Sequence, residues 1–375
     1  MQSGLPAPCG NGSPPASRSR IGRRPIGSAL ALTLCVGVLA SCGSAHNGPR
    51  AAAALVSIGA GLQGPGALRA TVYAKGPANT SAFAFDSSGR LWLTAAGLGS
   101  HAHDGVYLLA HAGARAVRVI RGLDDPLGIL WYRGRFYVAS VGRVDAYSGF
   151  DRRHFAKHVR ILSGPVAGGE NNLLVLAPSG RLVMGVTASC DHCKPRSSLS
   201  GAIVSFRPDG SDLRLYAAGI RAPVGLAFFP GTSDLFASMN QRDDLAAATP
   251  GDWLSLVREG ENWRFPNCYG QGGAVCAGVP EPTAVLDKHA AAGPVAIVTG
   301  QLGTSVGTAA IVTEWSTGQV KSVALTRTAS GYGGVTRTLL RGVRNPLALI
   351  LTPDGSLLLG DWTTGRIYRI SARAS

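Results

Sequence analysis

The sequence predicts an all-β fold, and three observations carry this prediction. Hydrophobic residues make up 45% of the 375 residues and charged residues only 15%, which is enough apolar material for a large core. Glycine and proline are frequent, with 51 and 22 residues. After residue 55, few stretches place apolar residues at every third or fourth position. We therefore expect short strands joined by turns, with helix only in fragments such as 251–258.

A repeat makes this prediction more specific. An apolar strand, a turn and a second strand recur as "FAFDSSGRLWLTA", "GILWYRGRFYVAS", "LLVLAPSGRLVMG", "GLAFFPGTSDLFASM" and "LILTPDGSLLLGD". The first four turns, at Gly89, Gly134, Gly180 and Ser233, are 45, 46 and 53 residues apart. The longer interval before Gly355 contains another copy, which begins "GPVAIVTG", and a segment at about 241–285 that we interpret as an insertion.

A period of about 45 to 50 residues with paired strands is typical of propeller blades. Six copies across residues 66–372 predict a six-bladed β-propeller of four-stranded blades. Such rings usually close when an N-terminal strand completes the last blade. We expect "ALRATVYA" at 67–74 to do this beside the C-terminal "GRIYRI".

The N-terminus predicts export. Residues 1–41 combine four arginines with the apolar run "IGSALALTLCVGVLAS", which is short for a membrane span. The run ends in Leu-Ala-Ser-Cys, which resembles the bacterial lipobox and makes Cys42 the expected lipid site of a lipoprotein. Residues 42–65 are then a lipid-anchored flexible tether. We expect the protein outside the cytoplasm of a bacterium, held to the cell membrane by the lipid alone.

Charge and cysteine content limit the partners. The whole chain has 36 Lys and Arg against 21 Asp and Glu, and it keeps a net charge of +11 once the four signal arginines are removed. No basic run interleaved with aromatics indicates nucleic acid. A basic surface could favour anionic lipid headgroups, cell-wall polymers or an anionic ligand, and we expect a monomer. Four cysteines remain for an oxidising compartment, as pairs Cys268–Cys276 and Cys190–Cys193. Metal binding by Cys190, His192 and Cys193 stays open.

Candidate site residues lie in the loops that lead into the first strand of each blade, here called leading loops. These loops gather around the axis of a propeller, so a site is assembled from several blades. Their polar residues include Asp124, Asp125, Glu170, Asn171, Asn172, Arg221, His289, Arg344 and Asn345. Trp315 and Trp362 follow Glu314 and Asp361 at equivalent strand ends, where they either stack on a sugar or pack between blades.

From about 66 to 372 the chain resembles the glucose/sorbosone dehydrogenase family. The segment "AAGIRAPVGLAFFPGTSDLFASMNQRDD" resembles the family's Gly-x-Arg-Asn-Pro-x-Gly-Leu block and the strand end after it. "GENWRFPNCYGQ", "LDKHAAAGPVAIVTG" and "NPLALILTPDGSLLLGDWTTGRIYRI" are similar to three later blocks. The resemblance implies a six-bladed propeller that oxidises sugars with pyrroloquinoline quinone (PQQ) and Ca²⁺.

The resemblance also implies residue roles. The family's general base is a His whose position falls here on Gly169 or Glu170, so Glu170 or His289 is the candidate catalytic base. Arg221 matches an arginine that contacts the cofactor, although Ala222 replaces the family's next residue, Asn. The other expected cofactor or substrate residues are Asn171, Asn172, Asn240, Gln241, Arg242, Trp315, Asp361 and Trp362. Calcium is expected at Asn240, Gln241 and Asp243, and Asp243 with Asp244 either adds charge for the ion or caps a turn.

Three functions therefore stay open. The first is a sugar or polyol dehydrogenase that uses PQQ and calcium. The second is a non-catalytic propeller lipoprotein that binds a cell-envelope glycan or protein, because the catalytic His is absent. Calcium-dependent hydrolysis of a lactone or ester is a third interpretation, for which Glu170, Asn171 and Asn240 supply part of the ligand set.

Overall fold

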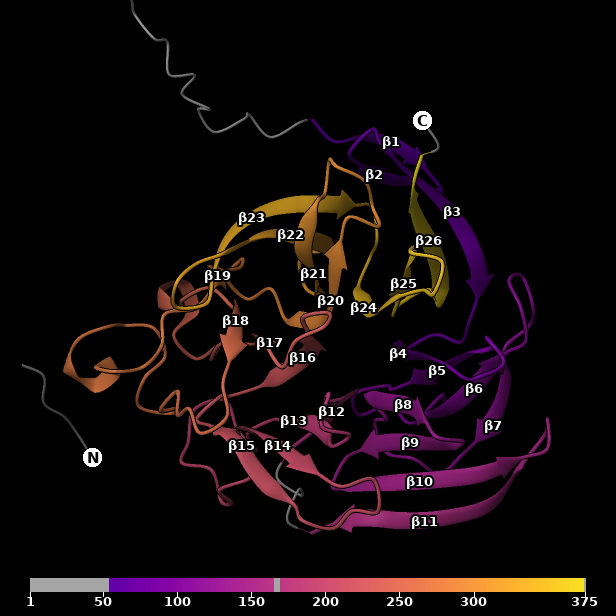
Figure 1. Ribbon diagram of the computed structural model, residues 1–375, viewed down its shortest axis with the longest axis horizontal. Helices are drawn as coiled ribbons and strands as arrows, with labels where there is room; N and C mark the ends of the chain where they lie inside the picture. Colours follow the sequence, from indigo (N-terminus) through magenta and orange to yellow (C-terminus); the bar gives the residue numbers. More distant parts are fainter. Residues whose placement is uncertain (1–53, 165–168, 374–375) are drawn as a thin grey trace, which may run out of the picture. The chain divides into compact units, whose positions relative to one another are not determined.

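The computed structural model describes residues 54–164 and 169–373. Contacts divide the chain into Met1–Arg50 and Ala51–Ser375, and every described residue belongs to the second unit. That unit is built from six antiparallel sheets arranged in a ring (Figure 1), which confirms the predicted six-bladed β-propeller. The signal peptide at 1–41 and Cys42 lie outside the described residues. Within the described ranges, no helix has the length and apolar character needed to cross a membrane.

Each blade is a four-stranded meander, with one addition to blade 5. Blade 1 comprises β4 (Thr80–Phe85), β5 (Leu91–Ala95), β6 (Gly105–Leu109) and β7 (Val117–Ile120). Blade 2 comprises β8 (Gly128–Tyr132), β9 (Arg135–Ser140), β10 (Arg143–Phe150) and β11 (Phe155–Ser163). Blade 3 comprises β12 (Asn171–Leu176), β13 (Leu182–Val186), β14 (Ala202–Phe206) and β15 (Arg214–Ala218).

The second half of the ring repeats the pattern. Blade 4 comprises β16 (Pro223–Phe228), β17 (Leu235–Met239), β18 (Trp253–Val257) and β19 (Ala284–Val285). Blade 5 comprises β20 (Ala292–Thr299), β21 (Thr308–Glu314), β22 (Gln319–Arg327) and β23 (Tyr332–Arg341). Blade 6 comprises β24 (Pro346–Leu351), β25 (Leu357–Asp361), β26 (Arg366–Ala372) and the N-terminal β3 (Leu68–Lys75).

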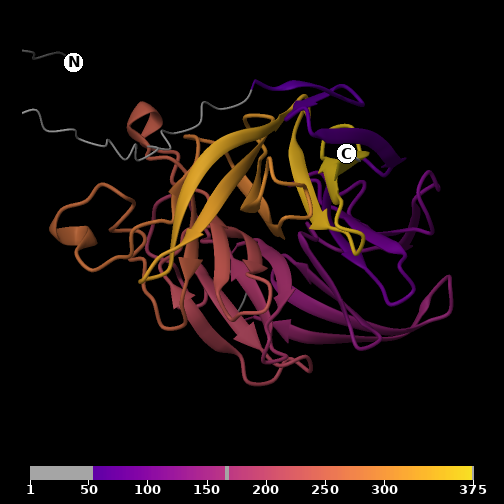
Figure 2. The ribbon, with the colours of Figure 1, turned by 45° about the horizontal axis from the view of Figure 1, so that its top comes forward.

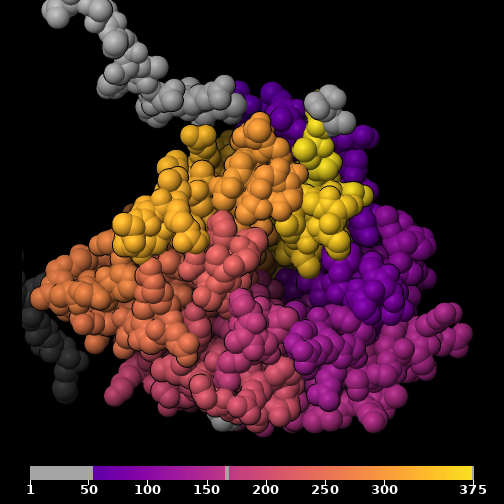
Figure 3. Space-filling view, viewed as in Figure 1, coloured from indigo at the N-terminus to yellow at the C-terminus, as the bar shows by residue number. Residues whose placement is uncertain are grey.

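The ring closes as predicted. β3 pairs with β26 from Leu68 opposite Ala372 to Lys75 opposite Arg366, so the two ends of the described chain share blade 6. In the space-filling view the yellow C-terminal strand lies against indigo N-terminal residues (Figure 3). Two further strands, β1 (Val56–Gly59) and β2 (Leu62–Gly64), form a hairpin whose Gln63 pairs with Arg341 of β23. The expectation of a flexible tether through residue 65 is therefore wrong for this part.

Two other expectations about blade 4 need correction. The segment 251–258 is not helical, because Trp253–Val257 forms β18, and β19 also falls within the predicted insertion at 241–285. The long loop is the stretch 258–283 between these strands, which carries the 3₁₀ turn η2 (Ala274–Cys276) and projects from the ring (Figure 2). A shorter loop before β18 holds η1 (Ala246–Ala248).

The first strand of each blade lines the centre of the ring. β4, β8, β12, β16, β20 and β24 each contact the next, and β24 contacts β4. Toward the carboxyl ends of these strands, a cavity of about 490 Å³ is lined by apolar residues that include Phe85, Trp131, Leu176, Ile297 and Leu351. Burial of these apolar faces between blades stabilises the ring. Polar side chains gather at the opposite end, where the leading loops lie.

Candidate functional site

A polar pocket of about 430 Å³ lies among the leading loops of blades 3, 4 and 5. Its charged lining consists of Glu170, Arg221, Asp243, Asp252 and His289. His289 and Ala291, which both line it, hold φ angles of 51° and 50°, a left-handed backbone that non-glycine residues rarely adopt. Such conformations cluster at functional sites because the surrounding structure must enforce them. This pocket is the candidate functional site.

Arg221 is held in place by a loop that follows β13. Its Nε donates a hydrogen bond to the carbonyl oxygen of Asp191 at 3.0 Å, and its Nη2 donates to Asp191 Oδ1 at 2.7 Å. Nη1 donates to the carbonyl oxygen of Asn240 at 3.2 Å. A guanidinium has about five N–H donors, so roughly two remain for a ligand in the pocket.

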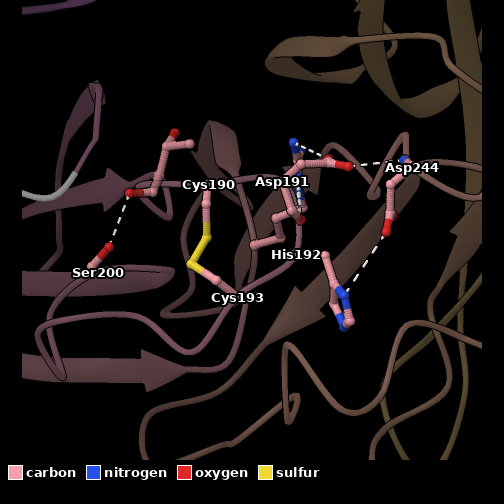
Figure 4. The surroundings of a disulfide bond; sticks show 8 residues. Cys190, Asp191, His192, Cys193, Ser200 and Asp244 are labelled. Atoms are coloured by element: carbon pink, nitrogen blue, oxygen red, sulfur yellow. Dashed lines mark hydrogen bonds and ion pairs between the residues drawn. A yellow bond between two sulfur atoms is a disulfide. The ribbon is translucent and has the colours of Figure 1, made fainter. Parts of the chain in front are cut away.

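Asp191 joins the loops of blades 3 and 4. Besides Arg221, its carboxylate accepts the backbone N–H groups of Asp243 at 2.9 Å and of Asp244 at 2.8 Å. Figure 4 shows Asp191 pointing away from the neighbouring disulfide and toward Asp244. Asp191 was not among the predicted site residues, although it belongs to the Cys-Asp-His-Cys motif.

The structure joins Cys190 to Cys193 and Cys268 to Cys276, the two predicted pairs. With both sulfurs of the first pair in a disulfide, Cys190 and Cys193 have no thiolate for a metal. His192 instead lies 3.8 Å from the carboxylate of Asp244 (Figure 4). The first disulfide fixes the loop that carries Asp191, and so it supports the position of Arg221.

His289 lines the pocket but is poorly suited to be a base. Its Nδ1 lies 2.7 Å from Asp243 Oδ1 and its Nε2 lies 2.9 Å from the carbonyl oxygen of Ala246. A carboxylate and a carbonyl oxygen are both acceptors, so His289 donates to the two of them at once only when both of its ring nitrogens carry protons. The hydrogen bond to Asp243, and then the bond to Ala246, raises the pKa of His289. With both ring nitrogens engaged by neighbouring oxygens, the imidazole is poorly placed to accept a proton from a ligand, which argues against the predicted role of His289 as general base.

Glu170 lies at the mouth of blade 3, one residue before β12, and is partly buried. Its carbonyl oxygen accepts the N–H of Thr187 at 3.0 Å, which fixes the backbone there. Among the described residues, no hydrogen bond or ion pair engages its carboxylate. Glu170 therefore lines the pocket with a carboxyl side chain to which no described residue is bonded.

Asp252 is a second carboxylate of the pocket, and the sequence analysis did not single it out. The side chain is buried, and burial raises the pKa of Asp252 to about 6 despite backbone hydrogen bonds that lower it. Oδ1 accepts the N–H of Gln241 at 2.8 Å and Oδ2 accepts that of Ala292 at 3.0 Å. Asp104 binds the N–H groups of Gly97 and Asp125 in the same way between blades 1 and 2. Asp252 thus has a structural role that recurs in the ring.

Of the residues that follow β17, some line the pocket and others are buried away from it. Asn240, Gln241 and Asp243, the expected calcium residues, line the pocket, and Asn240 Oδ1 is buried without a hydrogen-bond partner among the described residues. Arg242 does not line it. Its guanidinium is bound by Asp244 at 2.6 and 2.5 Å and lies over the ring of Tyr269 at 4.6 Å, where it is buried. The expected cofactor contact of Arg242 is therefore replaced by a structural one.

Asn171 and Asn172 also differ from the expectation, because they do not line the pocket. Asn171 is fully buried and its Nδ2 donates to the carbonyl oxygen of Ser140 at 2.8 Å, which links blades 3 and 2. Asn172 is 2% exposed and donates to Thr187 Oγ1 at 2.7 Å. These two side chains stabilise the position of β12 and leave Glu170 as the polar group of this segment in the pocket.

Trp315, Asp361 and Trp362 lie outside the pocket lining as well. The two indole rings meet edge to face, with centroids 5.5 Å apart. Trp362 Nε1 donates to the carbonyl oxygen of Ala96 at 2.8 Å, which connects blade 6 to blade 1. Asp361 is buried and accepts the N–H groups of Thr363 and Thr364 in a turn. The structure thus matches the inter-blade packing interpretation of the tryptophans.

A second cavity, of about 210 Å³, lies beside the polar pocket under the loop 258–283. Arg221 and Gln241 line both spaces, whereas Trp253, Trp263 and Phe265 give the second one an apolar wall. The disulfide cysteines Cys268 and Cys276 also belong to its lining. The long loop of blade 4 therefore adds an apolar neighbour to the candidate site.

No protein-family model matches the chain, and no curated protein sequence is similar to it. Solved structures do match. A PQQ-bound aldose sugar dehydrogenase from Streptomyces coelicolor is 18% identical, with a TM-score of 0.66 over 83% of this chain and 100% of that one. The holo PQQ domain of a pyranose dehydrogenase from Coprinopsis cinerea is 15% identical, with a TM-score of 0.68 over 83% and 97%.

A calcium structure of a Trichoderma reesei carbohydrate-active enzyme is 17% identical, with a TM-score of 0.68 over 83% and 96%. The chain has the fold of PQQ-dependent sugar dehydrogenases. The similarity covers nearly the whole length of each of these structures and agrees with the resemblance seen in the sequence. At these identities it shows the fold alone.

Proposed function

We propose that the protein is a sugar dehydrogenase-like propeller, exported and lipid-anchored through Cys42, that binds a sugar or polyol in the polar pocket and oxidises one hydroxyl with PQQ and Ca²⁺. The observation that supports this best is the lining of the pocket, where three carboxylates and two cationic groups surround a space of about 430 Å³. Sugar hydroxyls donate to carboxylates and accept from guanidinium and imidazolium groups. The likeness to sugar-oxidising propellers supports the reaction class.

The residues of the pocket fit the cofactors by their chemistry. PQQ carries carboxylates, for which Arg221, with about two N–H groups still free, is the natural partner. His289 adds a second fixed cation. Calcium prefers oxygen ligands, and Asn240 and Asp243 offer an amide oxygen and a carboxylate. When bound, the quinone accepts the hydride of the substrate carbon.

Within this proposal, Glu170 receives the hydroxyl proton. It stands at or beside the position of the family's catalytic His, and its carboxylate has no partner among the described residues. Asp252 is less suitable because both of its oxygens already accept backbone N–H groups. His289 orients the carboxylate of Asp243. It can donate a hydrogen bond to a ligand only if its bond to Asp243 or to the carbonyl oxygen of Ala246 breaks.

The decisive experiment titrates the protein, purified from detergent-solubilised membranes, with PQQ and Ca²⁺ while the quinone absorbance is followed. Dye reduction with several aldoses and polyols is then measured for the wild type and for Glu170→Gln. We expect wild-type turnover, and a loss of about 10²- to 10⁴-fold in the variant, because a general base contributes that much.

Glu259→Gln is the matched control, since Glu259 is an exposed carboxyl outside the pocket lining and its loss should leave the rate unchanged. The absence of quinone binding and of turnover would refute the redox proposal. Equal rates for wild type and Glu170→Gln would refute the role of Glu170 alone. Recovery of the protein in the soluble fraction would argue against the anchor.

The second candidate function is non-catalytic binding of a cell-envelope glycan at the same pocket. The observation that favours it is the state of His289, whose two ring nitrogens both face acceptors, together with the absence of a His at the mouth of blade 3. This candidate predicts glycan binding that neither chelator nor quinone changes. A tightly bound cofactor in the purified protein would rule it out.

A further inference from the structure

A cluster of metal-ligating side chains lies between blades 1 and 2, apart from the polar pocket. His101 and Asp104 belong to the loop between β5 and β6, and Asp124 and Asp125 belong to the leading loop of β8. Each residue offers one ligand atom, and these atoms all lie within 4.8 Å of one another. His101 Nδ1 is 2.8 Å from Asp104 Oδ2 and 3.6 Å from Asp124 Oδ1.

The charges of the cluster do not balance. Asp104 and Asp125 are 1% and 7% exposed, so two carboxylates are buried side by side, and a third, Asp124, lies at the surface. One imidazole faces all three. Arg118 of β7 also approaches, but its guanidinium bonds the carbonyl oxygens of Ala102 and Asp104 and not the carboxylates. A divalent cation would neutralise the excess negative charge.

Asp125 provides a second, independent observation. One of its oxygens accepts the N–H of Leu98 at 2.6 Å, and the other has no hydrogen-bond partner among the described residues. The side chain is more than nine-tenths buried and contributes a ligand atom to the cluster. Because its second oxygen accepts no hydrogen bond from a described residue, the lone pairs of that oxygen are available to coordinate a metal.

The fold itself does not require this carboxylate. In the equivalent arrangement between blades 4 and 5, Asp252 accepts the N–H of Ala292 just as Asp104 accepts the N–H of Asp125. Alanine therefore satisfies the structural role of that position. Asp125 uses one carboxylate oxygen to bind the N–H of Leu98, but its second oxygen, with Asp124 and His101 beside it, is not explained by the links between blades.

The carboxylates are also oriented in advance. Asp104 Oδ1 accepts the N–H of Gly97 at 2.8 Å and Oδ2 accepts that of Asp125 at 2.8 Å. Leu98 holds Asp125 in the same way. Backbone donors of this kind fix metal ligands in the direction of the ion and raise its affinity.

We propose that His101, Asp104, Asp124 and Asp125 bind one Zn²⁺ ion, which clamps the loop of blade 1 to the leading loop of blade 2. One imidazole nitrogen and carboxylate oxygens in a four-ligand set suit zinc, whereas Ca²⁺ and Mg²⁺ favour oxygen ligands alone. None of the four residues lines the polar pocket. The site is therefore independent of the proposed oxidation of a sugar.

The test is isothermal titration of the chelator-treated protein with ZnCl₂ in a buffer that contains excess Ca²⁺, which keeps the candidate calcium site out of the measurement. We expect one Zn²⁺ per chain. The affinity should fall by at least about tenfold in His101→Ala and in Asp124→Asn. Both side chains are more than half exposed, at 52% and 57%, so the variants keep the fold.

His103→Ala is the matched control, because this exposed His is in the same loop but outside the cluster, and it should bind Zn²⁺ as the wild type does. Zn²⁺ should also raise the melting temperature of the wild type and of His103→Ala, but not that of the two cluster variants. The proposal is overturned if the wild type binds no Zn²⁺, if excess Ca²⁺ abolishes binding, or if the cluster variants bind as tightly as the control. None of these results depends on enzymatic activity.

Discussion

Three consecutive residues at the start of blade 3 show what the sequence could and could not predict about side-chain positions. Glu170 lies in the polar pocket at the mouth of blade 3, as the repeat predicts, because a repeated strand pair fixes where the loop before it must be. Asn171 and Asn172 are the next residues and were expected beside it, yet they bond to Ser140 and Thr187. Side-chain direction changes at every position of a strand, so one residue separates a pocket group from a buried one.

Asp252 leads to a prediction on pH dependence. Its pKa of about 6 in the folded protein exceeds the usual 3.8, so between about pH 4 and pH 6 the folded state holds a proton that the unfolded state has released. Stability from this group is therefore present at low pH and is lost as pH rises through 6. Relative to Asp252→Asn, the wild type should lose on the order of 2–3 kcal/mol in unfolding free energy between pH 4 and pH 7.

Urea unfolding of both proteins at several pH values measures this difference. Asp209→Asn is the control with the opposite sign. Hydrogen bonds from Ser211, the side chain first, lower the pKa of Asp209, so this exposed carboxylate adds stability as pH rises. A constant difference between the wild type and Asp252→Asn across the range would contradict the raised pKa.

At the scale of strands, the inner strands approach their neighbours closely where glycine is present. A Cβ on Gly225 of β16 would overlap the carbonyl oxygen of Gly293 in β20 and would crowd Ser238 Oγ. Ser238 Oγ itself donates to that carbonyl at 2.6 Å and accepts the N–H of Gly225 at 2.8 Å. The contact between blades 4 and 5 thus leaves no room for a side chain.

Gly225→Ala should therefore lower the unfolding free energy by about 1–3 kcal/mol, through overpacking and strain at this contact. Gly66→Ala is the control, because a Cβ there would make only an ordinary contact with Val56. Chemical denaturation of the two variants and the wild type gives the comparison. Equal stability of both variants would mean that blades 4 and 5 separate easily to accept the methyl group.

The strands of blade 4 show why element prediction failed locally. All five residues of β18 are buried, so "WLSLV" lacks the alternation that marks a strand with one exposed face. β19 has only two residues, too few to carry any pattern. The loop 258–283 between them then made the whole segment resemble an insertion. The other blades were predictable because a glycine turn such as that at Gly89 separates strands of ordinary length.

For the whole molecule, the closed ring was predictable and the chemistry of the pocket was not. A sequence repeat predicts the fold because every blade packs against its neighbours through equivalent strands. The state of His289 and the engagement of Arg221 depend on partners from distant segments, namely Asp243, Asp191 and the carbonyls of Ala246 and Asn240. Backbone acceptors have no signature in a sequence, so these roles emerge only from the folded chain.

The closure of blade 6 predicts how the molecule tolerates truncation. A chain that begins at Ala54 retains every described strand and should unfold cooperatively, with near-native stability, in thermal melts followed by circular dichroism. A chain that begins at Gly76 lacks β1, β2 and β3, and leaves the edge of β26 that faces away from β25 without a partner strand. We expect this shorter chain to aggregate or to melt without a cooperative transition. A native-like melt of the shorter chain would show that the closing strand is dispensable.

The pairing of β3 with β26 also determines when the ring can close during synthesis and folding. β3 is among the first strands to be synthesised, and its partner β26 is the last. β3 therefore has no partner strand until nearly 300 further residues have been synthesised. During this time its backbone N–H and C=O groups are unpaired and can pair with other chains. Contacts so distant in sequence also slow folding. For the export proposed above, this favours a pathway in which the finished chain is kept from aggregating until both of its ends are on the same side of the membrane.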